Sequence, residues 1–376
     1  QDYRSNLIEI PREVLLRYSP EARIFPYIDK RQEVNVLKKI FNSQPISERD
    51  DHWYMDPYSE LHRSQDSDRF VEDPSTGDYP VIGGRHVHQF IHDTKMLSSL
   101  EEPSFWSVEE SKDPAKSAKK RIREKNYRRL KRDLYKAFDG TGSQKGFVNN
   151  LLEENGRDPL SEEDVLLDCT AYRIVYREIA RPTDERTMIA TIIPPNVTCY
   201  HKLHTVRPYM VNPEESDLAE TPLHSVYERI FEDQELFVAV GLLNSIPFDF
   251  LMRTKIDNSI VMYKFAESQM PRLTDGDDWF HYISDRAARL NCYGEEFAEM
   301  RDRLGGIDPA TDEQERRRLQ AEIDAAAFHA YGLDREDAKF VLNDFHRVEN
   351  PRLMDKDYFE MVLEIYDELA EAGPKP

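Results

Sequence analysis

The segment from Tyr172 to Pro195 constrains the fold more than any other part of the chain. Two runs in it, Tyr172–Ala180 and Arg186–Ile193, are dense in Ile, Val, Tyr and Met, and a short polar segment with Pro182 and Asp184 separates them. Apolar β-forming runs on either side of such a turn predict a β-hairpin. The second run is apolar at almost every position, so we expect this strand to be covered on both faces.

Basic side chains recur along the first run of the hairpin, at Arg173, Arg177 and Arg181. Because the second strand is expected to be buried, we expect these arginines to lie together on one accessible edge or face of the hairpin.

The length of 376 residues, with 39% hydrophobic residues, is enough for one large or two medium folded domains. No apolar run approaches the ~18 residues of a membrane span, and no basic-then-apolar leader opens the chain. We therefore expect a soluble, cytoplasmic protein without membrane contact, and the lack of an initial Met suggests a fragment. Cys169, Cys199 and Cys292 form no CxxC pair, so we expect neither a disulfide framework nor a cysteine zinc site.

The formal charge of −21 argues against nucleic-acid binding until its distribution is considered. Residues 116–136 carry eleven Lys and Arg against only two acidic residues, Glu124 and Asp133. Ile122, Leu130 and Leu134 recur at helical spacing, which predicts a basic amphipathic helix. Two interpretations stay open: a solvated helix lying over a sheet, or a helix that contacts phosphates.

The rest of the pattern predicts an α+β fold. We expect a sheet-centred N-terminal domain, residues 1–215, with the hairpin 172–193 at its centre, and a mainly helical C-terminal domain, residues 216–376. Helical periods predict helices at His224–Phe231, Gln234–Leu243, Trp279–Leu290, Glu296–Arg303, Asp312–Tyr331, Asp334–Phe345 and Asp355–Ala372. Strand-like alternation is expected over Tyr79–Ile91, with Gly83 and Gly84 as a turn or bulge.

Three histidines in this last segment, His86, His88 and His92, invite a metal interpretation, since residues 86 and 88 would share one face of a strand. The third histidine has no standard ligand spacing and no cysteine is near. Hydrogen bonding is therefore the favoured function of these side chains, and no metal is expected.

Four segments in order resemble the target-recognition region of the large N6-adenine DNA methyltransferases, of the type IIG restriction–modification enzymes and of the BREX and DISARM phage-defence systems. They are Arg85–Asp93 with Pro103–Glu109, then REIARPTDERTMIATIIPP in the central hairpin, Leu242–Ile256, and Leu319–Phe345. The chain differs from many relatives at Asp184, where Asn is expected. The resemblance implies a DNA target-recognition module whose methyltransferase catalytic domain, in cis or in trans, uses S-adenosylmethionine.

The chain itself lacks the motifs of such chemistry. It has no Gly-rich loop for S-adenosylmethionine and no Asn/Asp-Pro-Pro-Tyr/Phe segment, and the nearest string, Ile193–Asn196, has the wrong order. Motifs of serine hydrolases, zinc proteases and nucleases are also missing, although Glu110–Lys112 matches part of a nuclease motif. We expect no catalytic, cofactor-binding or metal-binding residue in this chain.

For DNA binding, the candidates are the basic side chains of the helix and of the hairpin: Arg121, Arg123, Lys125, Arg128, Arg129, Arg132, Arg177, Arg181 and Arg186. The helix would hold phosphates of double-stranded DNA, and the hairpin arginines would enter a groove. An alternative is that Arg181 and Arg186 pin the turn through ion pairs with Asp184 and Glu185. An alternative for the whole chain is an acidic protein-interaction or scaffold domain with a basic docking helix.

Overall fold

The fold is described from a computed structural model of the chain. It describes all residues except 1–7, 21, 22, 24, 27, 29, 63, 67–76, 94–105, 110–117, 346–350, 352 and 376. Residues 103–105 of the Pro103–Glu109 motif, the segment Glu110–Lys112 and Lys116 therefore lie outside the described residues.

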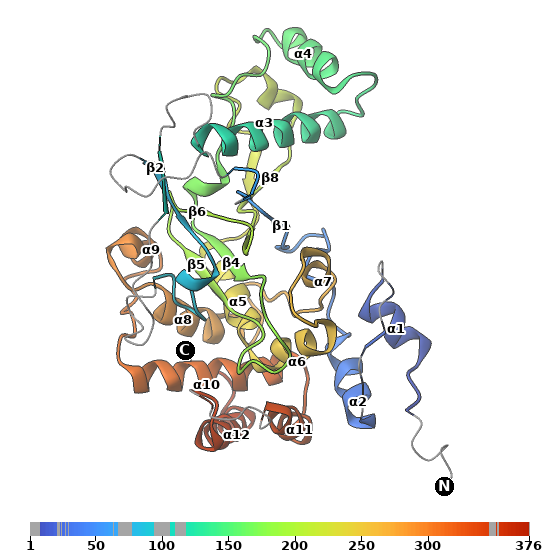
Figure 1. The fold of residues 1–376 in the computed structure, drawn as a ribbon, viewed down its shortest axis with the longest axis vertical. Helices are drawn as coiled ribbons and strands as arrows, with labels where there is room; N and C mark the ends of the chain where they lie inside the picture. The colour runs from blue at the N-terminus through green and yellow to red at the C-terminus, as the bar shows by residue number, and fades with distance from the viewer. Residues whose placement is uncertain are drawn as a thin grey trace.

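The predicted hairpin is present, and it is part of a four-stranded antiparallel sheet in the middle of the molecule (Figure 1). In spatial order the strands are β1 (Pro57–Tyr58), β7 (Leu203–Val206), β4 (Arg173–Arg177) and β5 (Ala190–Ile193). Ile189 is 8% exposed and Ile192 is fully buried, as are the other residues of β5. The expectation that the second strand is covered on both faces is confirmed.

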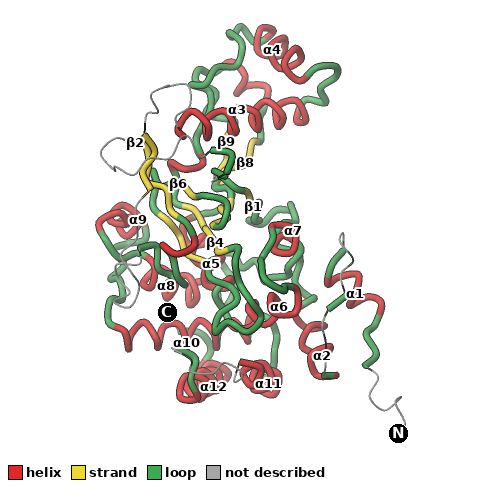
Figure 2. Tube along the Cα trace, viewed as in Figure 1, coloured by secondary structure: helices red, strands yellow, loops and turns green. Residues whose placement is uncertain are grey.

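A second, three-stranded sheet lies beside the first (Figure 2). In spatial order its strands are β3 (Trp106–Glu109), β2 (Gly77–Ile82) and β6 (Thr198–Cys199). The turn expected at Gly83 and Gly84 is present, as a 3₁₀ turn over Gly84–His86. The strand does not resume between this turn and Ile91, so that part of the prediction is wrong. At Gly83 the backbone lies against the Tyr200 ring, where a Cβ atom would stand only 2.0 Å from a ring carbon. Glycine is needed here because the two segments approach so closely.

The third sheet is a ribbon of β8 (Tyr209–Val211) and β9 (Tyr227–Arg229). The helix predicted at His224–Phe231 is therefore wrong. Pairing with β8 supplies the backbone hydrogen bonds of this segment, so the tertiary contact overrides its helical period.

Twelve α-helices are found in the described chain; most of them lie in the lower part of the molecule in Figure 1, and α3 and α4 lie at its upper end. They are α1 (Arg12–Tyr18), α2 (Arg31–Ile40), α3 (Ala118–Ala137), α4 (Gln144–Glu154), α5 (Asp233–Leu243), α6 (Ile246–Lys255), α7 (Met262–Ala266), α8 (Phe280–Asn291), α9 (Ala298–Arg303), α10 (Glu313–Ala330), α11 (Arg335–Phe345) and α12 (Lys356–Ala372). The five helices predicted after residue 278 are all present. The α+β fold class is therefore confirmed.

The central packing runs from the sheet into the helices. α5 packs against β5, β4 and α8, and α10 packs against both α8 and α12. α5 is apolar around its whole circumference because it is enclosed, with its residues from Leu236 to Leu243 all buried. α10 begins at Asp312, whose side chain accepts hydrogen bonds from the N–H groups of Gln314 and Glu315.

The principal hydrophobic cluster includes residues from Val14 to Leu369 and so draws on both sides of residue 215. A second cluster joins α3 and α4 to Leu160–Cys169 and to Leu218, Leu223 and Val226. The division into domains at residue 215 stays a prediction, although each cluster combines side chains from before and after it.

Among the described strands, only β4 pairs with β5, and side chains bind the backbone groups at the other edge of β5. The Asn244 amide accepts from the Ala190 N–H and donates to the Ala190 carbonyl, both at 2.9 Å. The Asn291 amide makes the same pair with Ile192, at 2.9 and 3.0 Å. Two asparagines thus satisfy the backbone groups that a further strand would otherwise bind.

Arg173 lies in the interior and is fully buried. Its guanidinium is 2.8 Å from Glu60 Oε1, and Glu60 Oε2 accepts a hydrogen bond from the Cys199 N–H at 2.7 Å. The expectation that Arg173 lies on an accessible edge is therefore wrong. Its charge is tolerated in the core because the carboxylate of Glu60 is buried beside it. Arg177 and Arg181 are treated with the candidate interface below.

All three cysteines are free and buried. Burial raises the pKa of Cys169 to about 12, which disfavours its thiolate. Among the described residues, no single helix is long and apolar enough to cross a bilayer; α5 and α6 meet that test only together, with a bend of 58° between them.

Lys255, at the end of α6, is a buried lysine that is 6% exposed. Its ammonium donates to the Glu267 carbonyl at 3.1 Å and lies 5.1 Å from the centre of the Tyr18 ring. Burial lowers the pKa of Lys255 to about 7, and the charge of the Glu267 carboxylate opposes the shift.

We expect Lys255 to make stability rise with pH. Its pKa is about 7 in the folded protein and ~10.4 in the unfolded chain, so the unfolded chain binds more protons between these values. The free energy of unfolding should therefore increase above pH 7 by up to ~1.4 kcal/mol per pH unit. Urea denaturation of the wild type and of Lys255→Met at pH 7 and about pH 8.5 should show the wild type gaining relative to the variant. The cysteines of the unfolded chain titrate near the same pH, at ~8.5, but they do so in both proteins, so their contribution cancels in the comparison. Lys339→Met, an exposed control, should leave the slope unchanged, and equal slopes in Lys255→Met and the wild type would contradict this pKa.

Removal of the edge seal should destabilise the protein strongly. Asn291→Ala leaves the buried Ile192 N–H without a partner, at a cost of ~1–3 kcal/mol, and leaves the Ile192 carbonyl with only the long contact of 3.4 Å from the Thr191 hydroxyl. Urea denaturation should show a total loss of about 2–5 kcal/mol. The control Asn212→Ala removes an exposed bond to Glu228 and should cost less than ~0.5 kcal/mol. A loss in Asn291→Ala no larger than in the control would show that the edge tolerates unpaired groups.

Candidate nucleic-acid interface

The basic segment forms α3, at the upper end of the molecule in Figure 1. α3 packs against α4 and contacts β2 and β8. Ile122, Leu130 and Leu134 are buried in the second hydrophobic cluster together with Val148 and Leu152 of α4. The predicted amphipathic helix is confirmed, and its apolar stripe is the side that packs on the protein.

Part of the basic side of α3 is used by the fold. Arg129 is 7% exposed; its guanidinium lies 3.3 Å from Asp168 Oδ1 and donates to the Tyr209 carbonyl at 2.5 Å. Arg121 pairs with the buried Asp66 at 3.2 Å. The Lys125 ammonium donates to the backbone carbonyl of Glu60. A DNA contact by these three basic residues stays a prediction, but each has a structural partner in the protein.

The other basic residues of α3 reach solvent. Arg128, Arg132 and Lys136 are exposed and follow one another at intervals of four residues, so they form a row along one side of the helix. At 1.5 Å per residue the row spans about 12 Å. Arg132 Nε lies 3.0 Å from Asp133, and Arg123, to one side of the row, lies 3.8 Å from Glu162. Among the described residues, Arg128 has no ion-pair partner. We call Arg128, Arg132 and Lys136 the exposed basic row.

The candidate arginines of the hairpin also include both buried and exposed side chains. Arg186 is 7% exposed, with Nη2 at 2.7 Å from Asp324 of α10 and Nη1 donating to the Asn244 carbonyl at 3.3 Å. The guanidinium of Arg177 donates to the Val87 carbonyl, and burial lowers the pKa of Arg177 to about 10. Of the candidate arginines in the hairpin, Arg181 has an exposed side chain.

The ion pairs proposed to pin the turn are replaced by a different arrangement. Arg186 turns inward to Asp324, and Arg253 of α6 holds the turn instead. The Arg253 guanidinium donates to the carbonyls of Pro182, Asp184 and Glu185 at 2.7, 2.6 and 3.0 Å. Sequence reasoning missed Arg253, because it lies about seventy residues after the turn and no local pattern links the two.

Further contacts make the turn 181–185 rigid. Arg253 is itself held by Asp249, at 2.9 Å, and lies over the Phe345 ring at 4.0 Å. Glu185 accepts hydrogen bonds from the N–H groups of Leu353 and Met354, at 2.6 and 2.7 Å. The side chains of Arg181, Thr183 and Asp184 remain exposed on this fixed backbone.

The exposed basic row and this turn belong to different regions of the molecule. α3 lies at the upper end in Figure 1, whereas the turn is bonded to α6 and to the chain before α12. The candidate basic residues of the helix and the exposed hairpin candidate Arg181 therefore lie in different regions of the fold, and their contacts with DNA stay a prediction.

The histidines expected to form hydrogen bonds are dispersed. His86 Nδ1 lies 3.0 Å from the Gly83 nitrogen, and the His92 ring stacks on Tyr293 with 4.3 Å between ring centres. Burial lowers the pKa of His92 to about 4. In the part of the chain that the structure describes, no group of three His, Cys, Asp or Glu side chains is arranged to hold a metal ion.

Comparison with known proteins gives one similar structure to report. No family model matches the chain, and no curated protein matches it. Among solved structures, the chain is similar to MmeI, a type IIL restriction–modification enzyme whose structure was determined in complex with DNA. The TM-score is 0.38 at 13% identity, over 87% of this chain and 36% of that enzyme. This chain therefore spans about a third of the enzyme's length, and a TM-score this low does not establish a common fold.

We expect Arg253 to be the residue that orders the turn. Arg253→Lys keeps the charge beside Asp249 but removes the planar fork that donates to three carbonyls. Hydrogen–deuterium exchange should become faster over residues 181–187, with a loss of about 1–3 kcal/mol in stability. Arg181→Ala, which truncates an exposed side chain of the same turn, is the control and should leave exchange as in the wild type. Unchanged exchange in Arg253→Lys would mean that the turn is held by its other contacts.

Proposed function

We propose that this chain is the target-recognition part of a larger DNA methyltransferase that modifies adenine at N6, of restriction–modification or phage-defence type. In this proposal the chain binds double-stranded DNA and performs no methyl transfer of its own. The four ordered segments of the sequence that resemble such recognition regions support it.

The observation that carries the proposal is the exposed basic row of α3. A protein with a net charge of −21 repels polyanions over most of its surface, so an unneutralised row of cations is a place where a phosphate backbone could be held. The acidic partners Asp133 and Glu162 reduce but do not cancel this charge, because Arg128 and Lys136 have no ion pair among the described residues. Arg129 is buried and paired with Asp168, whereas the side chains of the exposed basic row point to solvent. The stability of the fold therefore does not depend on the charge of the row.

The turn 181–185 would supply a second kind of contact. Its backbone is fixed by Arg253, so the exposed Arg181 and Thr183 would be presented without a large loss of conformational entropy on binding. Arginine is well suited to hydrogen bonding with base edges, guanine above all. Because the turn lies apart from α3, each region would contact its own stretch of DNA or act in a different step.

Methyl transfer is assigned to a catalytic domain, in cis or in trans. That domain would hold S-adenosylmethionine and take the target adenine out of the duplex. Nothing in this chain's sequence matches the motifs that such a site needs.

Loss of the exposed basic row should weaken DNA binding without regard to sequence. The triple variant Arg128→Gln, Arg132→Gln, Lys136→Gln removes up to three phosphate contacts. Fluorescence anisotropy with a duplex at several salt concentrations should show lower affinity for every sequence tested. The slope of log affinity against log salt should decrease by about 0.9 for each lost contact.

A matched control removes three exposed lysines elsewhere, with Lys38→Gln, Lys339→Gln and Lys356→Gln. It changes the net charge equally and should leave most of the affinity and the salt slope in place. If the row variant and this control behave alike, the row is a solvated helix face. The docking-helix alternative would then be favoured by salt-dependent binding of the row to an acidic protein with no binding to DNA.

A further inference from the structure

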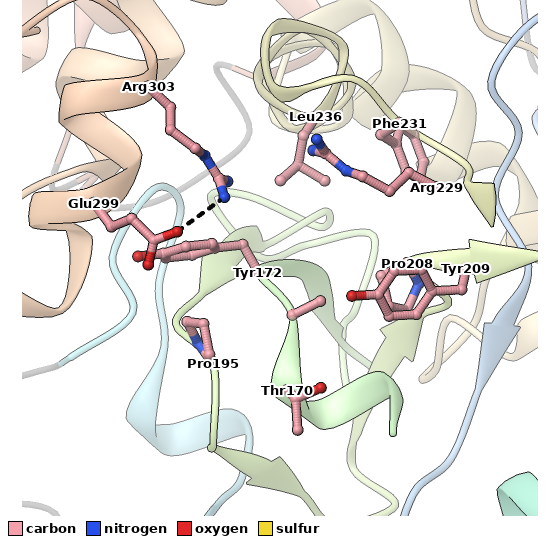
Figure 3. A pocket seen from close by; sticks show the side chains of 11 residues that line it. Thr170, Tyr172, Pro195, Pro208, Tyr209, Arg229, Phe231, Leu236, Glu299 and Arg303 are labelled. Carbon is pink, nitrogen blue, oxygen red and sulfur yellow. Dashed lines mark hydrogen bonds and ion pairs between the residues drawn. The ribbon is translucent and has the colours of Figure 1, made fainter. Parts of the chain in front are cut away.

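A cavity of about 200 Å³ lies between the β8–β9 ribbon, α5 and α9, next to the residues that precede β4 (Figure 3). Its aromatic lining comes from Tyr172, Tyr209 and Phe231, and its polar groups come from Arg229, Glu299 and Arg303. None of the residues predicted to bind DNA lines this cavity.

The two tyrosine rings are held in place from outside the cavity. The Tyr172 hydroxyl donates to the Glu296 carbonyl at 2.7 Å, and its ring packs against Phe297 with 5.1 Å between centres. The Tyr209 backbone is fixed by β9 and by Arg129, which donates to its carbonyl. Rigid aromatic faces of this kind favour a flat ring as the occupant, because stacking then costs little ordering.

Hydrogen-bonding groups converge on the same space. The Tyr209 hydroxyl points into the cavity in Figure 3 and has no hydrogen-bond partner among the described residues. Glu299 stands beside the Tyr172 ring, with its Oε1 at 3.3 Å from Arg303 Nη1, and its side chain is 74% exposed. A carboxylate acceptor and a guanidinium donor therefore stand side by side at the mouth.

The charge at the mouth disfavours a phosphate inside. Asp233 binds both guanidiniums, with Arg303 Nε at 2.9 Å and a second bond from Arg229. Together with Glu232 and Glu299, three carboxylates face two guanidiniums. The local charge is slightly negative, so a neutral ligand fits better than an anion.

The volume sets the size of that ligand. About 200 Å³ would hold roughly six or seven waters at ~30 Å³ each, and pockets for drug-sized molecules are larger, at ~300–1,000 Å³. The occupant should therefore be a single ring system.

We propose that this cavity binds a nucleobase, and that guanine is the best match. The base lies beside the Tyr172 ring, over which the Arg303 guanidinium also stands at 5.4 Å, and within reach of the Tyr209 hydroxyl. The N1–H and amino donors of its edge face the Glu299 carboxylate. The adjacent ring carbonyl accepts from Arg303. Guanine offers two neighbouring donors next to an acceptor, which complements a carboxylate next to a guanidinium. The base comes either from a free nucleoside or from an unstacked position in a nucleic-acid strand.

The first arm of the test uses free nucleosides with the whole chain. Saturation-transfer NMR and calorimetry with 2′-deoxyguanosine should detect saturable binding, with a dissociation constant on the order of 1 mM or tighter. 2′-Deoxyinosine, which lacks the amino group, and 2′-deoxyadenosine should bind more weakly. Glu299→Gln should weaken the binding of 2′-deoxyguanosine about 10-fold or more, while Asp302→Asn, an equal charge change on an exposed residue of α9, should not. Tyr209→Phe should also weaken it while retaining the ring.

The second arm distinguishes the source of the base. A duplex with one unpaired dG and the same duplex fully paired are compared for binding to the wild type and to Glu299→Gln. A preference for the unpaired dG that Glu299→Gln abolishes assigns the cavity to a strand, whereas nucleoside binding without that preference assigns it to a free nucleoside. No binding of 2′-deoxyguanosine and no preference for the unpaired dG, or binding that neither Glu299→Gln nor Tyr209→Phe alters, overturns the proposal.

The outcome is separable from the function proposed above. Variants of the exposed basic row on α3 change duplex affinity and its salt dependence but leave nucleoside binding unchanged, since Arg128, Arg132 and Lys136 do not line the cavity. Failure of one proposal therefore leaves the other to its own test.

Discussion

The described fold depends on the way in which the open edge of β5 is closed. This strand is buried on both faces, and its outer N–H groups, at Ala190 and Ile192, are satisfied by Asn244 and Asn291. Each asparagine stands at the end of a helix, so the positions of α5 and α8 are tied to the strand by hydrogen bonds rather than by packing alone. A shift of either helix would leave buried polar groups unpaired, which costs more than the loss of a few apolar contacts.

From this edge, a buried polar network extends into the C-terminal helices. The Asn244 carbonyl accepts from Arg186 and from Gln89, and Arg186 pairs with Asp324 of α10. Tyr358 of α12 donates to the same carboxylate at 2.6 Å, and the Ile246 N–H donates to its other oxygen. Asp324 is thus satisfied on both oxygens, as a buried charge requires. This carboxylate joins the sheet to the C-terminal helices. The principal hydrophobic cluster likewise contains side chains from both sides of residue 215.

The basic side chains serve two purposes that their sequence context does not separate. Arg129 of α3 and Arg186 of the hairpin form ion pairs with buried carboxylates. Arg128 and Arg132, which also belong to α3, are exposed to solvent. Interior guanidiniums make the fold specific because they need partners with fixed geometry. The solvent-facing guanidiniums are the ones available to a ligand, and this division gives the proposed recognition surface its limited extent. Rigidity recurs in the turn 181–185 and in the ring-lined cavity, where contacts from behind hold exposed groups in place.

The sequence by itself determined the local elements and their type. Runs dense in β-forming residues predicted β4 and β5, and the helical periods predicted the five helices after residue 278. The spacing of Ile122, Leu130 and Leu134 predicted which side of α3 is buried. These features depend on neighbours within a few residues, so a local pattern contains them.

Only the tertiary structure decided which polar side chains form hydrogen bonds and ion pairs within the protein. Arg173 finds Glu60, Arg186 finds Asp324, and Arg253 finds the turn, over separations of 68 to 138 residues. The segment Tyr227–Arg229 became a strand because β8 was there to pair with it. The ring-lined cavity likewise combines residues from Thr170 to Arg303. Hydrogen bonds and ion pairs of this kind form only where the fold brings two groups within about 3 Å of each other. A local sequence pattern does not show which distant segments will meet in this way.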